Sequence, residues 1–361
     1  MEWITNAALF LVISLQAGAP PEPGEVLSLP PDLVKLADEK IAARAQSPER
    51  RLDLLIDFIA DSNGLNFSYR SDPTHTVGET FDQSEGNCLS YTLMFMSLAR
   101  QLDLNVYPRE VRVPPAWQDR GQTVFEVGHV NVGVETPSRH TTVDFDPDLL
   151  RSQRLAASWR GQRISENRAL AHFYNNRAAE LLADNAPWVA RAWLDQALEL
   201  EPDFLPALNT YGVVERRLGN PDLALERFRQ ALNAEGDITN TLINLVSLSR
   251  SQGDAQAADR YRQQLESLRP DDPWFQWALG QHEENAGRLI DAARYYRRAV
   301  GLSRSEPRFH AGLARVLFEL GDTANAFQAL ALALQSSPPS ARDQYQAKLE
   351  QLKKVSSDWP E

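Results

Sequence analysis

The chain has 361 residues, 43% of them hydrophobic, and a formal net charge of −12. This length exceeds one typical domain, so we expect two folded parts with packed cores. The acidic charge argues against a nucleic-acid partner, whose phosphates would be repelled. One cysteine excludes an internal disulfide framework, and the six scattered histidines form no zinc motif. We therefore expect neither a metal nor a cofactor.

The N-terminus resembles an export signal. Residues 7–15, AALFLVISL, form an apolar run too short to span a bilayer. The AGA at 17–19 is similar to a small-residue cleavage site, which favours an exported protein of the bacterial periplasm. Glu2 and Pro20 are unfavourable for such a signal, so an uncleaved membrane anchor and a plain N-terminal helix of a cytoplasmic protein stay open. Residues 20–31 are predicted to be a Pro-rich linker.

Residues 32–150 predict an α+β domain. PDLVKLADEKIAARA and RRLDLLIDFIADS have the apolar spacing of helices, and a third helix begins at Cys88. The segments VYPREVRV, TVFEVGHVNVGVE and HTTVDFD follow, and they alternate as strands do. Helices followed by strands are typical of an α+β fold. Residues 151–170 are expected to connect this domain to the second half of the chain.

Cys88 opens its predicted helix directly after a Gly-Asn pair. At a helix N-terminus, unpaired backbone N–H groups and the positive end of the helix dipole favour a thiolate, which is a nucleophile. The alternative interpretation is a small buried hydrophobic residue, the commoner role of a free cysteine.

Two strands predict an imidazole close to a carboxylate. In VGHVNVGVE, alternation places three valines on one face and His129 with Asn131 on the other. In TTVDFDP, Asp144 and Asp146 share the face that the apolar residues do not occupy. The short link TPSR predicts an antiparallel hairpin, which brings His129 to the face of the two aspartates. Such a carboxylate would orient the ring and stabilise its charged form. Solvated side chains near a turn are the alternative.

The order of these motifs resembles the transglutaminase-like superfamily, a papain-like group of thiol enzymes. GNC with its apolar helix and ARQLDLNVYPREV, then HVNVGV and TVDFDP, are similar to the core motifs of that superfamily. The resemblance covers about residues 32–150. It implies that Cys88 is the nucleophile, His129 its general base and Asp144 the group that orients the histidine. Asp146 remains the competitor for the third role.

The resemblance implies acyl transfer at an amide through a thioester on Cys88. Gln83, five residues upstream, could help to stabilise an oxyanion, or it is an ordinary polar loop residue. We expect hydrolysis by a cysteine peptidase or amidase, because the single tryptophan between Cys88 and Asp144, Trp117, lies in a Pro-flanked loop and predicts no shielding tunnel. Protein transamidation is one alternative. A non-catalytic repeat adaptor with a degenerate enzyme domain is the other.

An internal repeat with a constant period organises the second half of the chain. Alanine recurs at this spacing at Ala190, Ala224, Ala258, Ala292 and Ala326. Twelve residues before these alanines lie Ala178, Gly212, Val246, Gly280 and Ala314, and twelve after three of them lie Pro202, Pro270 and Pro338. Small residues let paired helices approach closely, and proline ends the second helix. The pattern resembles the tetratricopeptide repeat, with five units in residues 171–338 and a capping helix and tail in 339–361.

The tetratricopeptide resemblance implies a protein or peptide partner in a groove lined by the first helix of each unit. The residues expected in this groove are Asn209, Arg216, Arg250, Trp277 and Gln281. The aromatic group around Trp277 is expected to serve inter-helix packing more than binding. The fold class predicted for the chain is therefore an α+β, papain-like core followed by an all-α superhelix. Residues 171–361 are expected to fold without the first domain.

Overall fold

The structure is a computed structural model. It describes residues 19–60, 64–70, 72–111, 117–119, 124–126, 129–145, 161–338 and 342–350. The expected export signal and Asp146 lie outside these residues, as does the side chain of His129. None of the helices in the described ranges is both long and apolar enough to cross a bilayer. The chain forms two compact units, residues 1–116 with 126–248 and residues 117–125 with 249–361.

The N-terminal helices of the first unit surround one central helix. They are α2 (Pro23–Val26), α3 (Pro31–Lys40), α4 (Pro48–Ala60), α5 (Val77–Gln83) and α6 (Cys88–Gln101), with a 3₁₀ turn at Ala42–Arg44. Proline at the first helical position starts α3 and α4, where its missing N–H costs nothing. A capping box between Thr76 and Glu79 starts α5. In α6 every residue from Leu89 to Ala99 is buried, so this helix forms the middle of the core.

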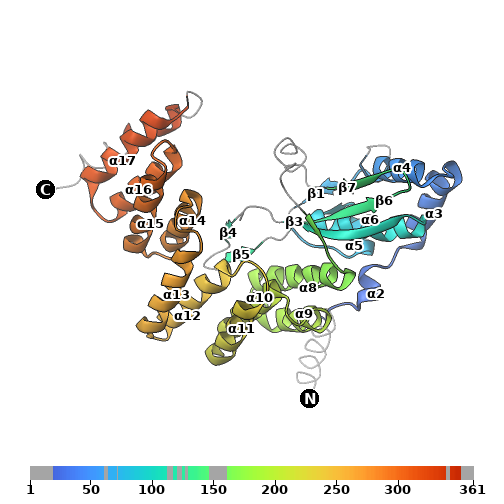
Figure 1. Cartoon of the computed structure of the whole chain (residues 1–361), viewed down its shortest axis with the longest axis horizontal. Coiled ribbons are helices and arrows are strands. Elements are labelled where there is room, and N and C mark those ends of the chain that lie inside the picture. The colour runs from blue at the N-terminus through green and yellow to red at the C-terminus, as the bar shows by residue number, and fades with distance from the viewer. Residues whose placement is uncertain are drawn as a thin grey trace, which may run out of the picture. The chain divides into compact units, whose positions relative to one another are not determined.

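A four-stranded antiparallel sheet covers α6 (Figure 1). Its strands are β3 (Asn105–Val111), β6 (His129–Glu135), β7 (His140–Val143) and β8 (Gly161–Arg163), in the order β7-β6-β3-β8. Val132 pairs with Val143, which confirms the predicted hairpin and its register. The buried valines of β6 face α6, where the Thr92 hydroxyl donates to the Val130 carbonyl at 3.0 Å. Phe145 lies on the same side, with its ring centroid 5.7 Å from that of Phe95.

Two further strand pairs are short. β1 (Ser68–Tyr69) pairs in parallel with β2 (Glu85–Gly86), and β4 (Trp117–Asp119) pairs with β5 (Val124–Glu126). The segment 123–135, expected as one strand, therefore contains two strands that belong to different sheets. The expected connection, residues 151–170, contains β8 and the start of the first repeat helix.

The repeats are antiparallel helix pairs. Those of the first unit are α8 (Glu166–Ala183) with α9 (Pro187–Leu200), α10 (Leu205–Arg217) with α11 (Pro221–Asn233), and the first part of α12 (Thr239–Ser251). The expected role of the small residues is confirmed at Gly212, where an added Cβ would lie 2.4 Å from a ring carbon of Phe228. The paired helices can approach this closely because glycine has no side chain at the contact.

The second unit contains further helices of the repeat. It holds α13 (Ala255–Leu268), α14 (Pro273–Asn285), α15 (Leu289–Leu302), α16 (Pro307–Glu319) and α17 (Thr323–Ser336). Gly280 repeats the close contact, with an added Cβ 2.6 Å from a ring carbon of Tyr296. Residues 342–350 are helical, and Tyr345 is buried in a cluster with Ala314, Ala329, Leu330 and Ala333. This helix therefore covers the apolar surface of the last repeat.

The first repeat helix packs on the N-terminal elements as well as on its own repeat. Glu180 accepts a hydrogen bond from the Thr74 N–H at 2.7 Å. Glu110 of β3 forms an ion pair with Arg168, with 2.8 Å between the Arg168 Nε and a carboxylate oxygen. Burial raises the pKa of Glu110, but contacts with His172 and Arg168 outweigh burial and lower this pKa to about 2. A cut at residue 171 would remove the first turn of α8 and break these contacts, which argues against the expectation that 171–361 folds alone.

Candidate functional site

Cys88 is the first residue of α6, and it is half-buried. The preceding Asn87 caps the helix, since its side-chain oxygen accepts from Leu89 N at 3.1 Å and from Ser90 N at 3.0 Å. The Asn87 carbonyl accepts from Tyr91 N at 3.1 Å. Within the described residues nothing accepts from the Cys88 N–H, so the cap leaves that one donor beside the thiol unused.

The cap belongs to a buried hydrogen-bond chain that reaches the first repeat. The Asn87 amide nitrogen donates to the Thr74 hydroxyl at 2.7 Å, and the Thr74 N–H donates to Glu180 of α8. Glu180 also pairs with Arg177, at 2.9 Å. Burial nevertheless raises the pKa of Glu180. The position of the thiol helix therefore depends on a carboxylate that a repeat helix supplies.

The predicted partners of Cys88 lie on or beside β6 and β7. His129 opens β6, and its backbone pairs with Val111 of β3. Asp144 follows β7 and accepts a hydrogen bond from the Asn131 side chain at 2.9 Å. This contact confirms that alternate residues of the two strands share a face. Asn131 is buried, and its side-chain oxygen has no donor among the described residues.

The structure relates the start of α6 to the start of β6. Thr92, which bonds to the carbonyl of Val130, lies one turn after Cys88, about 6 Å along the helix. The Val130 carbonyl therefore lies about one helical turn from Cys88 along α6. Asn131 and Asp144 lie on the sheet face away from α6, and the described residues hold no contact between Asp144 and Cys88. Gln83 is exposed at the end of α5, separated from the cysteine by a turn and by β2.

Two of the expected groove residues lie where successive first helices meet. Asn209 of α10 accepts from the Asn244 side chain of α12 at 3.0 Å. Arg216 of α10 donates to the Ser247 hydroxyl of α12 at 3.1 Å. We call the line of contact between the first helices α8, α10 and α12 the first-helix seam. Sequence reasoning missed Asn244 and Ser247, although both lie on the face of α12 that turns toward α10.

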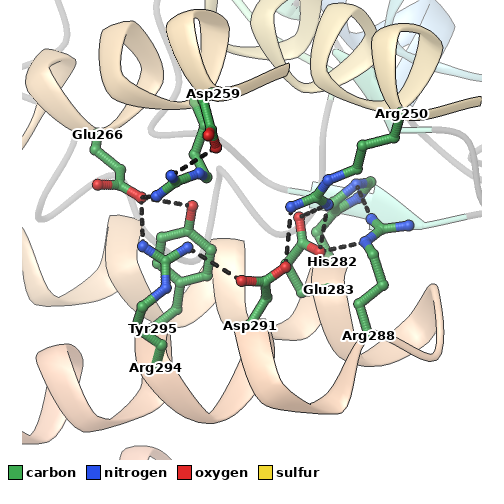
Figure 2. Close-up of polar contacts among 10 residues, drawn as sticks. Arg250, Asp259, Glu266, His282, Glu283, Arg288, Asp291, Arg294 and Tyr295 are labelled. Carbon is green, nitrogen blue, oxygen red and sulfur yellow. Dashed lines mark hydrogen bonds and ion pairs between the residues drawn. The ribbon is translucent and has the colours of Figure 1, made fainter. Parts of the chain in front are cut away.

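Arg250, another expected groove residue, is paired inside the array. Figure 2 shows it between two carboxylates, Glu283 at 3.1 Å and Asp291 at 2.9 Å. Arg288 also bonds to Glu283. Burial raises the pKa of Glu283, but the two arginines outweigh it and hold that pKa below its usual range. These contacts join α12, α14 and α15, so the Arg250 guanidinium serves the internal structure.

The same network continues toward α13. Glu266 accepts from Arg294 at 2.8 Å and from the Tyr295 hydroxyl at 3.1 Å (Figure 2). Arg262 pairs with Glu266 at 3.3 Å and with Asp259 at 2.8 Å. Each arginine of this network therefore has at least one carboxylate partner within the described part of the second unit, and Glu283, Asp291 and Glu266 are each shared by two arginines.

The remaining expected groove residues lie on α14. Trp277 is half-buried, with its ring centroid 5.8 Å from that of Trp274 and 6.4 Å from that of Phe309. This confirms packing between helices as its main contact. Gln281 is half-buried on the same helix. No cluster of candidate metal ligands occurs among the described residues.

No protein-family model and no curated protein matches the chain. Solved structures with similarity include the APC/C hetero-tetramer Cut9-Hcn1, at 18% identity over 58% of this chain and 39% of that chain, with a TM-score of 0.34. PilF of Pseudomonas aeruginosa matches at 19% identity over 54% of this chain and 96% of its own, with a TM-score of 0.35. YrrB, a TPR protein with an unusual peptide-binding site, matches at 21% identity over 49% and 92%, with a TM-score of 0.29.

The repeats are defined by the sequence and structure of the chain itself. The helix pairs follow the constant period of the sequence. The small residues of that period lie at the helix contacts. For residues 32–150 the transglutaminase-like likeness remains one of sequence motifs. The second half of the chain is an array of paired helices with a constant period, and it resembles the tetratricopeptide repeat in its sequence pattern and helix pairing.

Proposed function

We propose that the chain is a repeat scaffold that binds a protein partner along its first-helix seam. The observation that carries the proposal is a set of buried polar groups whose hydrogen bonds the described residues do not complete. Asn175 of α8 and Asn240 of α12 are at least nine-tenths buried, and neither side-chain oxygen has a donor. A buried acceptor left without a donor costs about 1–3 kcal/mol, which a bound N–H group would recover.

The chemistry of this seam suits a peptide backbone. An asparagine side chain offers both a donor and an acceptor, as a peptide group does. Asn175 lies one repeat period before Asn209, and Asn240 lies one turn before Asn244 on α12. The amides therefore recur from one first helix to the next. A partner that lies across successive helices would meet them in turn.

Peptide display on the full-length chain tests the proposal. Random dodecamers are selected on the immobilised protein, and the affinities of the enriched peptides are measured by fluorescence anisotropy. Asn240→Ala should weaken binding at least fivefold, because it removes an amide from the seam. Gln230→Ala, on the second helix α11, is the control and should change binding less than twofold. Failure of the full-length chain to enrich any peptide would contradict the scaffold function.

Thiol-dependent acyl transfer is the second candidate, favoured by the unused Cys88 N–H and by the hydrogen bond that joins α6 to the start of β6. His129 would accept the thiol proton, and the Cys88 sulfur would attack an amide carbonyl. The oxyanion that forms would be met by the Cys88 N–H. Loss of the amine, protonated by the histidine, leaves a thioester, and water then hydrolyses it to the acid and restores the thiol. Asp144 would orient the histidine.

Chemical labelling tests this candidate without a known substrate. The rate of Cys88 alkylation by iodoacetamide is measured against pH in the wild type and in His129→Ala. An activated thiol should react with an apparent pKa well below the ordinary value of about 8.5, and the histidine variant should lose that advantage. Ordinary thiol reactivity in both proteins would exclude the catalytic role. Amine incorporation into a glutamine-donor protein would then distinguish transamidation from the hydrolysis that we favour.

A further inference from the structure

His75 is a buried histidine beside the cap of α6. It lies directly before Thr76, the N-cap of α5, and its side chain is 5% exposed. Its backbone N–H donates to the Ser90 hydroxyl at 2.8 Å, and that hydroxyl donates to the Asn87 side-chain oxygen at 3.1 Å. The preceding residue, Thr74, accepts from the Asn87 side-chain nitrogen. The backbone around His75 therefore holds the residues that start the thiol helix.

The contacts of the imidazole do not suit a charged ring. Its Nε2 atom is buried and has no hydrogen-bond partner among the described residues. Its Nδ1 atom lies 3.9 Å from a Glu79 carboxylate oxygen, which is too far for a hydrogen bond. The same oxygen accepts from the Thr76 N–H at 2.8 Å and so belongs to the capping box of α5. An imidazolium would bring two N–H donors and a positive charge to a site that satisfies neither donor.

The environment of the ring disfavours its charged form. Burial lowers the pKa of His75 below the ordinary value of about 6.5. The carboxylates of Glu79 on α5 and Glu85 on β2 raise this pKa and Arg177 on α8 lowers it, but burial is the largest cause. A ring that leaves the site for water would regain its ordinary pKa, so the open form binds the proton more tightly than the closed form. The closed form is therefore favoured above about pH 6.5 and is lost progressively as pH falls below that value.

We propose that residues 74–76 form an acid-sensitive latch on the start of α6, with His75 as the group that takes up the proton. A proton on the buried ring either draws the Glu79 carboxylate away from the Thr76 N–H or drives the ring into water. Both movements separate residues 74–76 from Asn87 and loosen the cap beside the thiol. The start of α6 therefore opens more often as the solution becomes acidic. The latch acts on this cap whatever the chemical role of the thiol.

Hydrogen exchange of the full-length chain, read by mass spectrometry at pH 7.5 and at pH 5.5, tests the latch. Exchange rates of peptides that cover residues 72–80 and 86–92 are divided by the intrinsic rates at each pH, which gives the open population. In the wild type this population should rise about threefold to tenfold at pH 5.5, because one pH unit below the ordinary pKa allows at most about tenfold. His75→Phe keeps a ring that takes up no proton, so its rise should be less than about twofold.

His140→Phe is the matched control. The His140 Nδ1 atom also lies 3.9 Å from a carboxylate oxygen, that of Glu135, but its side chain is 77% exposed. This variant should therefore show the full rise of the wild type. If His75→Phe does not fold, His75→Gln replaces it and should likewise remove the rise. Glu180 is retained in these variants, so a rise that persists without His75 would assign the acid effect to another group and overturn the latch. A wild type whose open population is the same at both pH values would overturn it as well.

Discussion

Replacing Glu283 with Gln removes the carboxylate that two arginines share in Figure 2. The Glu283 side chain is 9% exposed, while Arg250 and Arg288 are 28% and 30% exposed. Breaking a fully buried ion pair costs about 3–5 kcal/mol, and an exposed pair contributes about 0–1 kcal/mol. With arginines about one-third exposed, and with Asp291 still paired to Arg250, we expect a loss of about 2 kcal/mol at pH 7.

The effect of Glu283→Gln should depend on pH in a defined direction. The folded-state pKa of Glu283 is lowered, so its stabilisation is present above the unfolded-state pKa and is lost as pH falls through the folded-state value. The difference in the free energy of unfolding between wild type and variant should therefore shrink below about pH 4.5. Above that pH it should be constant until other groups titrate.

Urea unfolding followed by circular dichroism, together with hydrogen exchange of α14 and α15, measures this difference at pH 7 and at pH 4. The hydrogen-exchange data are needed because a chain with two compact units need not unfold in one step. Asp259→Asn is the control, since that side chain is 63% exposed and its ion pair should contribute little to the free energy of unfolding. A Glu283→Gln variant within about 0.5 kcal/mol of the wild type at pH 7 would refute the reasoning.

Three further substitutions test other contacts. Gly212→Ala places a Cβ 2.4 Å from a buried phenyl ring. The overpacking should cost about 1–3 kcal/mol, which exceeds the helix-propensity gain of about 1 kcal/mol, so the melting temperature should fall. The control is Gly301→Ala, which has nothing within 4 Å of the added Cβ and should not lower the melting temperature. Glu180→Gln weakens the hydrogen bond from the Thr74 N–H, which supports the Asn87 cap of α6. The rate of Cys88 alkylation by iodoacetamide should therefore change severalfold, while the far-ultraviolet circular dichroism spectrum stays the same. An unchanged rate would show that α8 does not influence the thiol. Asp144→Asn should slow that labelling at neutral pH with a melting temperature close to wild type, and a large loss of stability instead would indicate a structural role.

The repeat could be predicted from the sequence because its spacing reflects contacts that recur in space. The small residues lie where a ring of the paired helix fills the contact, as Phe228 does at Gly212. A second signal accompanies the first. Gly219, Gly253, Gly287 and Gly321 also recur with the period of the repeat, with φ of +81°, +75°, +72° and +80°, between the two helices of a repeat. Asn185 holds the equivalent place in the first repeat, with φ of +60°.

The N-terminal domain could be predicted in part. Alternation of apolar residues is enough for the hairpin of β6 and β7, and the contact of Asn131 with Asp144 follows from its register. The start of α8 is not predicted although a local signal exists, since Ser165 caps that helix by accepting from Arg168 N at 3.0 Å. The first turn of α8 begins with the polar residues Glu166, Asn167 and Arg168, so the sequence shows no apolar stripe there that would indicate a helix.

Other features depend on partners that are distant in the sequence. Arg216 and Arg250 are the same residue at the same place in the repeat, and only acids 33 and 41 residues after Arg250 distinguish them. No local pattern around either arginine contains that information. The support of the Asn87 cap by Glu180 is equally non-local, since it passes through the backbone of Thr74, 106 residues before the carboxylate.

The two candidate functions share one helix. Asn175 lies on α8 in the first-helix seam, and its side-chain oxygen has no donor among the described residues. Glu180, which supports the cap of the thiol helix, lies five residues later on α8. A partner that orders the seam would therefore restrain the helix that holds the Asn87 cap in place. Because α8 also packs on β3 through Arg168, it belongs as much to the N-terminal domain as to the repeats. Binding at the repeats and reactivity at Cys88 are then properties of one folded unit, and deleting either half would disturb both.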